Sequence, residues 1–204
     1  MTIDFIESEI DFFKERRQLS QVLCEGVDLV QNPFKDDFNL FIAFEFDRIY
    51  SEMFYGGLLR FLNDINDTEF TFYTLNPIPD KYFFENFSRY SIGKIPINAA
   101  FTDYMDFLDR DPGNSPADAL LYNAETIAIY SNTSVWGFIG SKDLEIGIIG
   151  FNSGEIKNKF ISHFEDSYFT TLEDRINEII NMLELSRESE GVYSEMIRRY
   201  PAVG

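Results

Sequence analysis

The sequence predicts an α+β fold, in which a mostly antiparallel sheet is covered by helices. Strand-like and helix-like segments alternate over the first half of the chain, and three short β segments follow one another between residues 126 and 151. Apolar residues make up 45% of the 204 positions and aromatic residues 17%, which favours a folded core over disorder. No linker separates the two halves, so we expect a single domain over residues 1–204.

The first elements are read from the spacing of apolar residues. Between Ile3 and Phe13 these recur every three or four positions, which predicts an amphipathic helix with Thr2 as its N-cap and helical character up to Gly26. Side chains alternate over Phe38–Phe46, which is typical of a strand. The next segments are predicted as a helix (47–63, with a Gly56-Gly57 pair), a strand (69–75), a helix capped by Asp80, a short strand (94–97) and a helix (101–108).

The second half begins with a Pro- and Gly-containing loop over residues 109–116 and a short helix over 117–123. Three segments, 126–130, 135–139 and 144–149, are joined by short polar turns, as in an antiparallel meander. Helices are predicted over 155–163 and 171–187, the second with a capping box that starts at Thr170. A last helical turn at 192–199 ends before Pro201.

The charge is the strongest functional indication in the sequence. The chain carries 35 acidic and 17 basic residues, a net charge of −18. Residues 1–70 hold 15 acidic and 6 basic residues, so this third of the chain contributes −9. Such a field repels nucleic acid and membranes and attracts basic proteins. We therefore expect a basic protein partner, no direct nucleic-acid contact and no membrane contact, and the sequence leaves the oligomeric state open.

The expected compartment is the cytoplasm. A single cysteine, Cys24, forbids an internal disulfide, so the chain does not require an oxidising environment. The first residues lack the basic and apolar regions of a signal peptide, and no apolar stretch is long enough for a membrane span.

Reaction chemistry is not indicated by the residue inventory. One Cys and one His are too few for a thiolate or imidazole zinc site, and phosphate-binding glycine loops and a nucleophile elbow are absent. His163 lies among apolar residues and is interpreted as structural, and Cys24 as a small buried hydrophobe. Neighbouring carboxylates are expected by chance among 35 acids. We expect no enzyme activity, no catalytic residues, no metal and no cofactor.

The aromatic residues admit a structural interpretation. Residues 34–107 contain 20 aromatic side chains, and their spacing on strands and helices indicates a core rather than a platform for nucleic-acid bases. The meander Ser134–Gly150 holds the only Trp and four Gly. Either the glycines accept bulky Phe neighbours in a curved sheet, or they leave a flat face open to a partner. This stretch, together with the acidity, resembles small bacterial immunity proteins that neutralise toxins of interbacterial competition; the resemblance assigns no residue a role.

The function predicted is that of a non-catalytic inhibitor, namely an immunity protein that blocks a basic toxin. Local charge density in the N-terminal third gives the predicted partner-binding residues, which are Asp28, Asp36, Asp37, Glu45, Asp47 and Glu52. Two alternatives stay open. A DNA mimic would block a nucleic-acid-binding or defence protein with carboxylates arranged like phosphates. An enzyme would use carboxylates together with His163, in a pocket around that residue.

Overall fold

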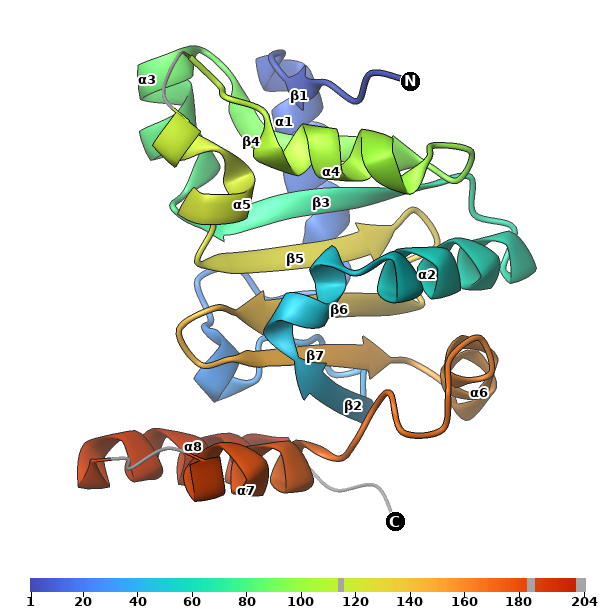
Figure 1. The fold of residues 1–204 in the computed structure, drawn as a ribbon, viewed down its shortest axis with the longest axis vertical. Coiled ribbons are helices and arrows are strands. Elements are labelled where there is room, and N and C mark those ends of the chain that lie inside the picture. The colour runs from blue at the N-terminus through green and yellow to red at the C-terminus, as the bar shows by residue number, and fades with distance from the viewer. Residues whose placement is uncertain (114–115, 183–185, 201–204) are drawn as a thin grey trace.

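The computed structural model describes residues 1–113, 116–182 and 186–200, which are built around one antiparallel sheet (Figure 1). Within these residues the sheet has seven strands in the order β1-β4-β3-β5-β6-β7-β2. The strands are β1 (Phe5–Ile6), β2 (Leu40–Glu45), β3 (Glu69–Asn76), β4 (Tyr90–Pro96), β5 (Thr126–Ser131), β6 (Trp136–Ser141) and β7 (Ile146–Phe151). The predicted α+β fold with a mostly antiparallel sheet is confirmed.

The predicted meander forms the middle of the sheet. β5, β6 and β7 are successive neighbours, with Tyr130 opposite Gly137 and Ser141 opposite Ile146. β3 pairs with β5 on one side of the meander, and β2 pairs with β7 on the other. Strands from the N-terminal half therefore flank the meander on both sides, so that the two halves of the chain share one sheet.

Helices cover both faces of this sheet. In Figure 1, α2, α4, α5 and α6 lie in front of the sheet, α1 lies behind it, and α7 and α8 lie beyond β2. The α-helices are α1 (Glu9–Leu19), α2 (Glu52–Asp64), α3 (Phe84–Phe87), α4 (Phe101–Asp109), α5 (Leu120–Asn123), α6 (Gly154–Ile161), α7 (Leu172–Met182) and α8 (Arg187–Arg199). Shorter helical turns are η1 (Leu29–Gln31), η2 (Phe46–Tyr50), η3 (Pro79–Phe83, a π-helical turn) and η4 (Pro116–Asp118).

Each face of the sheet carries its own core. In front, Trp136 of β6 packs against Phe61 of α2 and Phe160 of α6, with ring centroids 5.6 and 6.2 Å away. Behind, Phe12 of α1 and Ile176 of α7 belong to a second cluster that includes the other face of the same strands. Aromatic side chains thus fill the interior, as their spacing predicts.

Because both faces are covered, the meander offers no open face. Every residue of β6 and β7 is buried. At Gly140 an added Cβ would lie 2.4 Å from the ring of Phe138 and 2.7 Å from that of Phe46, so the glycine admits close packing of two rings. The interpretation of the glycines as neighbours of bulky Phe side chains is confirmed, and a flat face open to a partner is wrong.

The N-terminal helix differs from its prediction. Phe5 and Ile6 form β1, and α1 begins only at Glu9, where the side chain of Ser8 caps it. The predicted apolar stripe is wrong, since Ile10 is 81% exposed and Phe13 51% exposed. The buried face of α1 carries Phe12, Glu15 and Leu19. Pairing of β1 with β4 draws the first residues into the sheet, and this leaves a different face of α1 against the core.

Several ends of elements also differ. The predicted helix at 47–63 begins as η2, and α2 follows with Ser51 as its N-cap. Asp80 lies inside η3, and its side chain makes no capping hydrogen bond. The hydroxyl of Thr171, rather than that of Thr170, accepts a hydrogen bond from a backbone amide of α7. α8 is longer than the predicted last turn, and Pro201 lies outside the described residues.

Candidate functional site

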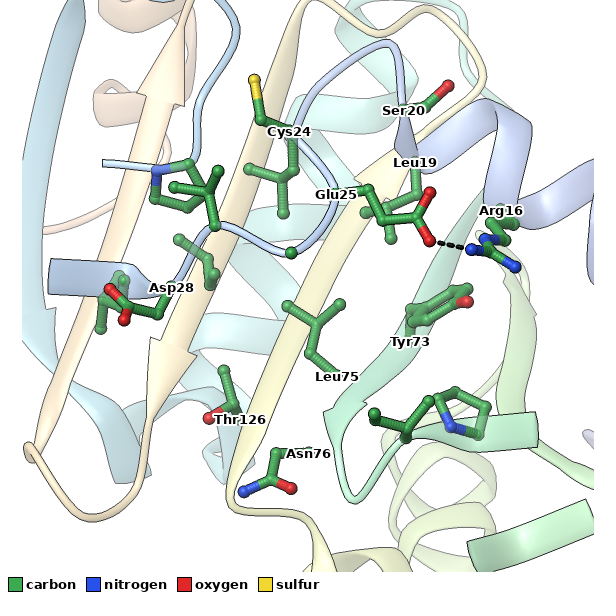
Figure 2. A pocket seen from close by; sticks show the side chains of 18 of the residues that line it. Arg16, Leu19, Ser20, Cys24, Glu25, Asp28, Tyr73, Leu75, Asn76 and Thr126 are labelled. Atoms are coloured by element: carbon green, nitrogen blue, oxygen red, sulfur yellow. Dashed lines mark hydrogen bonds and ion pairs between the residues drawn. The ribbon is translucent and has the colours of Figure 1, made fainter. Parts of the chain in front are cut away.

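A cleft of about 690 Å³ lies on the α1 side of the sheet. Its floor is formed by side chains of β3, β5 and β6, among them Tyr73, Leu75 and Ile139. One wall is α1 with the segment 20–30, and the other is formed by residues 78–81, at and just before the start of η3 (Figure 2). The volume falls within the range of about 300–1,000 Å³ that is usual for ligand-binding pockets.

Backbone hydrogen bonds hold the wall formed by residues 20–30. The amide of Cys24 donates to the carbonyl of Pro33 at 2.6 Å, and the amide of Lys35 donates to the carbonyl of Val22 at 2.9 Å. The side chain of Asp28 caps η1 by accepting from the amide of Gln31 at 3.0 Å. These contacts fold the segment back on itself, so that its apolar side chains face the sheet without filling the space above the floor.

The polar groups of the cleft are few. Arg16 of α1 and Glu25 of the facing segment form an ion pair across its edge (Figure 2). Tyr73 is only 4% exposed, and its hydroxyl makes no hydrogen bond to the described residues but is accessible from the cleft. Burial raises the pKa of Tyr73, the charge of Arg16 opposes that rise, and the carboxylates of Asp80 and Glu15 add to it. Tyr73 therefore stays protonated and able to donate a hydrogen bond at neutral pH.

Asp80 is the carboxylate of the cleft without a partner. Among the described residues it forms no ion pair and no hydrogen bond through its side chain. Glu25, in contrast, is paired with Arg16, and Asp28 is engaged as the cap of η1. Lys81, the next residue, also lines the cleft and has no ion pair among the described residues, so the lining holds one unpaired carboxylate and one unpaired ammonium group beside largely apolar walls.

Exposed apolar side chains surround the cleft. Val27 and Ile78 line it and are 37% and 55% exposed. A stack of rings continues from Phe12 in the lining to Tyr90, at 4.2 Å between centroids, and from Tyr90 to the exposed Phe84, at 4.6 Å. Apolar side chains that gather around a pocket mark a site of interaction on the surface of a protein.

The six predicted acids do not form one cluster. Asp28 lines the cleft, Asp36 and Asp37 lie in the turn before β2, and Glu45 ends β2. Asp47 follows in η2 and Glu52 in the first turn of α2. β2 has six residues, so its two ends are about 17–20 Å apart. All six acids are exposed. β2 separates Asp36 and Asp37 from Glu45, Asp47 and Glu52, whereas Asp28 lies apart from both groups, at the cleft.

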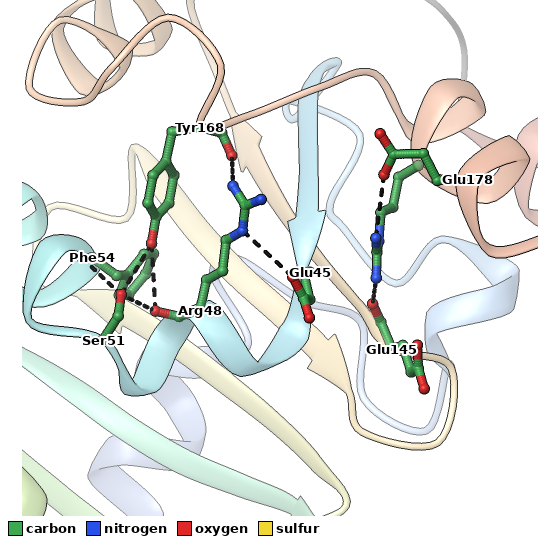
Figure 3. Close-up of polar contacts among 8 residues, drawn as sticks. Glu45, Arg48, Ser51, Phe54, Glu145, Tyr168 and Glu178 are labelled. Atoms are coloured by element: carbon green, nitrogen blue, oxygen red, sulfur yellow. Dashed lines mark hydrogen bonds and ion pairs between the residues drawn. The ribbon is translucent and has the colours of Figure 1, made fainter. Parts of the chain in front are cut away.

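Two arginines lie beside the group at the end of β2 (Figure 3). Arg48 donates to the carbonyl of Tyr168 at 2.7 Å, lies over the ring of Tyr168 at 5.0 Å, and is 3.7 Å from the carboxylate of Glu45. Arg175 of α7, which is buried, donates to the carbonyl of Glu145 at 3.0 Å and pairs with Glu178. Both guanidinium groups hold C-terminal segments against the edge of the sheet, so their roles are structural.

A buried carboxylate lies on the same side of the sheet as the cleft. Glu15 is 2% exposed and accepts hydrogen bonds from Thr71 at 3.0 Å and from Tyr130 at 3.3 Å. Lys94 is 3.5 Å from Glu15 and also pairs with Glu69. Burial lowers the pKa of Lys94, but the hydrogen bond to Glu69 and the charges of both glutamates outweigh it, and the pKa is raised. This network is satisfied within the protein and joins α1 to β3, β4 and β5.

His163 was interpreted as a structural residue and Cys24 as a small buried hydrophobe, and the structure places both. His163 follows α6, and its Nε2 is 2.8 Å from Oδ2 of Asp64 at the end of α2, a contact that joins the two helices. An acid is thus within reach of His163, but neither of the two cavities described is lined by this residue. Cys24 is half-buried at the wall of the cleft rather than fully buried. No group of three or more potential metal ligands occurs in the described part of the chain.

Compared with protein-family models, curated proteins and solved structures, the chain matches none. In the described residues no helix is both long enough and apolar enough to cross a bilayer. The site therefore has to be interpreted from its own geometry. Sequence reasoning located Asp28 but missed the cleft, because Tyr73 and Leu75 meet Ile139 and segment 20–30 only through the pairing of β3, β5 and β6 and the return of that segment over the sheet.

Proposed function

We propose that this chain is a non-catalytic acidic inhibitor that binds and neutralises a basic protein, most simply a bacterial immunity protein that blocks a toxin in the cytoplasm. The observation that carries the proposal is the state of the six predicted acids. All six are exposed, and only Glu45 has a cation near it within the described residues. These six of the 35 acidic groups are therefore presented to solvent, and five of them form no ion pair within the described residues.

The physical effect expected of such a surface is rapid and selective association. Opposed fields raise association rates by about 10–10³-fold, and close charge pairs at an interface couple by about 1.5–7 kcal/mol. A toxin that cleaves nucleic acid carries Lys and Arg to hold phosphates. An acidic protein bound over those residues excludes the substrate and needs no chemistry of its own.

The predicted acids that precede β2 in the sequence and those that follow it can be tested separately. One variant changes the acids before β2 and the other those after it, each with the same change of +5 in charge, and Asn at position 28 keeps the cap of η1. The two variants are D28N/D36K/D37K and E45Q/D47K/E52K. A control with the same charge change alters exposed acids of α4 and of the segment after α6, as D106K/D109K/E165Q.

The assay is coexpression of each variant with each candidate basic toxin encoded beside this chain's own gene, with growth of the bacterium as the readout. Association rates of the purified proteins at about 50 and about 500 mM NaCl accompany it. We expect one of the two variants to lose protection and to associate at least about tenfold more slowly, and the control to protect. Protection by both variants refutes the mapping to these six acids. A wild-type chain that gives no protection and does not bind the toxin refutes the function.

A further inference from the structure

The cleft has the size and lining of a binding pocket and is not filled by the protein's own side chains. Its volume is about 690 Å³, and Leu75 and Ile139 contribute to an apolar floor. Figure 2 shows Leu75 and Tyr73 between the two walls. Tyr73 is nine-tenths buried, lines this space and has no hydrogen-bond partner among the described residues. Its hydroxyl is accessible from the cleft, so a bound ligand can exchange a hydrogen bond with it in place of water.

Three acids and two bases, Arg16 and Lys81, line the cleft, which gives the lining a net charge of −1. Arg16 is already paired with Glu25, and the acid at position 28 caps η1. Asp80 is left without a partner beside apolar walls, and it lies close enough to Tyr73 to raise the pKa of its hydroxyl. An incoming ammonium or guanidinium group would therefore meet an acceptor that no residue of this chain occupies.

The surroundings of the cleft indicate a protein ligand rather than a free small molecule. Val27 and Ile78 extend the apolar lining outward, and Phe84 continues it through the stack on Tyr90. A small molecule inside the cleft would leave these side chains exposed. A polypeptide that crosses the cleft would cover them, with a central anchor in a pocket as protein interfaces usually have.

We infer that the cleft between α1, the segment 20–30 and residues 78–81 anchors a bulky apolar side chain of the basic partner, and that Asp80 binds a Lys or Arg next to that anchor. This inference rests on the proposed function and names the chemistry of the partner segment. It is supported by the unpaired carboxylate of Asp80 and by the exposed apolar side chains around the cleft. The acids of the proposed inhibitory surface then steer the partner, and the cleft holds it.

Short capped peptides test the cleft directly. The probe is acetyl-Arg-Leu-Trp-Lys-amide, and its two controls are acetyl-Arg-Ser-Ser-Lys-amide, which lacks the anchor, and acetyl-Glu-Leu-Trp-Glu-amide, which reverses the charge. 2-Naphthylmethanol represents a small apolar ligand. Binding is followed by ¹H–¹⁵N correlation spectra of the full chain, which also locate the perturbed residues.

Two variants and two matched controls complete the design. L75W fills the cleft, and Y122W adds the same ring at an exposed position of α5 on the other face of the sheet. D80N removes the free charge at constant shape, and D109N removes an exposed charge from α4. Circular dichroism and thermal unfolding establish that each variant is folded; L75A, which empties part of the floor, replaces L75W if that variant is not.

We expect the basic apolar peptide to bind at least about tenfold more tightly than either control peptide, with shifts centred on the cleft. D80N should weaken it about fivefold or more, and L75W or L75A should weaken it more strongly, whereas Y122W and D109N should not. Equal binding of the serine peptide, insensitivity to the change at position 75, or a preference for 2-naphthylmethanol over the basic peptide would overturn the inference. Full protection against the toxin by L75W would leave the proposed function intact and remove the cleft from it. Binding of the basic apolar peptide by a chain that gives no protection against the toxin would support the cleft as a binding site and refute the proposed function.

Discussion

Two neighbouring glycines of α2 should respond in opposite directions to the same substitution. A Cβ added at Gly57 would lie 2.3 Å from the ring of Phe164, a distance that requires the ring or the helix to move. A Cβ added at Gly56 would meet only the flexible end of Arg60, at 3.4 Å. Both positions are inside the helix, so replacement by Ala improves intrinsic helix propensity equally at each.

The magnitudes follow from these two contributions. Ala instead of Gly in a helix interior stabilises by about 0.8–1 kcal/mol, which is the whole expected effect of Gly56→Ala. Overpacking against a ring typically costs about 1–3 kcal/mol, and this applies to Gly57→Ala alone. The free energies of unfolding of the two variants should therefore differ by about 1–3 kcal/mol, with Gly56→Ala the more stable.

Urea denaturation followed by the fluorescence of the single Trp measures both variants. With a slope of about 2 kcal/mol per M, the midpoints should lie about 0.5–1.5 M apart. Replacing Phe164 by Leu gives the decisive third background, since it removes the ring that the new methyl group meets. There the two alanine variants should be equally stable. Equal stability in the wild-type background, or a difference that survives Phe164→Leu, would refute the packing argument.

Three further predictions concern the buried polar groups. Glu15→Ala should destabilise by about 2–4 kcal/mol in urea denaturation, because two hydroxyl donors and Lys94 lose a buried acceptor; a loss below about 1 kcal/mol would contradict this. Ser131→Ala should cost about 1–3 kcal/mol by the same measurement, since the indole N–H of the fully buried Trp136 donates to Ser131 at 2.7 Å, and an unchanged midpoint would argue against that bond. Burial, with a smaller contribution from a neighbouring carboxylate, raises the pKa of Tyr55 to about 12, so its contribution to stability is complete below the unfolded value of about 10 and is lost as the pH rises toward about 12. Urea midpoints that fall over this alkaline window are expected, and a flat profile would count against the assignment.

The spacing of apolar residues correctly predicted those helices and strands in which the apolar side chains are also the ones that face the core. α2 buries Phe54, Leu58 and Phe61 as predicted. Of the predicted stripe of α4, Tyr104 and Leu108 are buried and the other two residues are half-buried, and the meander forms between the predicted polar turns. α1 shows where this reasoning ends. Ile10 and Phe13 lie at helical spacing and are nevertheless exposed, while Glu15 is buried, because Thr71 and Tyr130 satisfy its carboxylate from strands far along the chain. A pattern of neighbouring residues cannot predict a hydrogen-bond partner that is more than 50 positions away in the sequence.

The predicted site was found only in part. Asp28 lies at the cleft, but Asp80 was interpreted as a helix cap and is instead the free carboxylate of the lining. The spacing of Asp37 and Glu45 along the sequence looks short, yet the extended strand between them places them at opposite ends of the sheet. Local charge density counts acids that are close along the sequence. In an extended strand, acids a few positions apart in the sequence are far apart in space.

By itself the sequence determined the composition of this protein's surface and interior: an excess of acids, an aromatic core, an antiparallel meander and the lack of familiar catalytic motifs. These properties depend on residue type and on short-range spacing, which the chain carries directly. Only the tertiary structure decided that both faces of the meander are covered, that the acids are divided, and that a cleft with an unpaired carboxylate opens behind the sheet. These properties depend on which strands pair and where a loop returns, and both are set by contacts between residues distant in sequence.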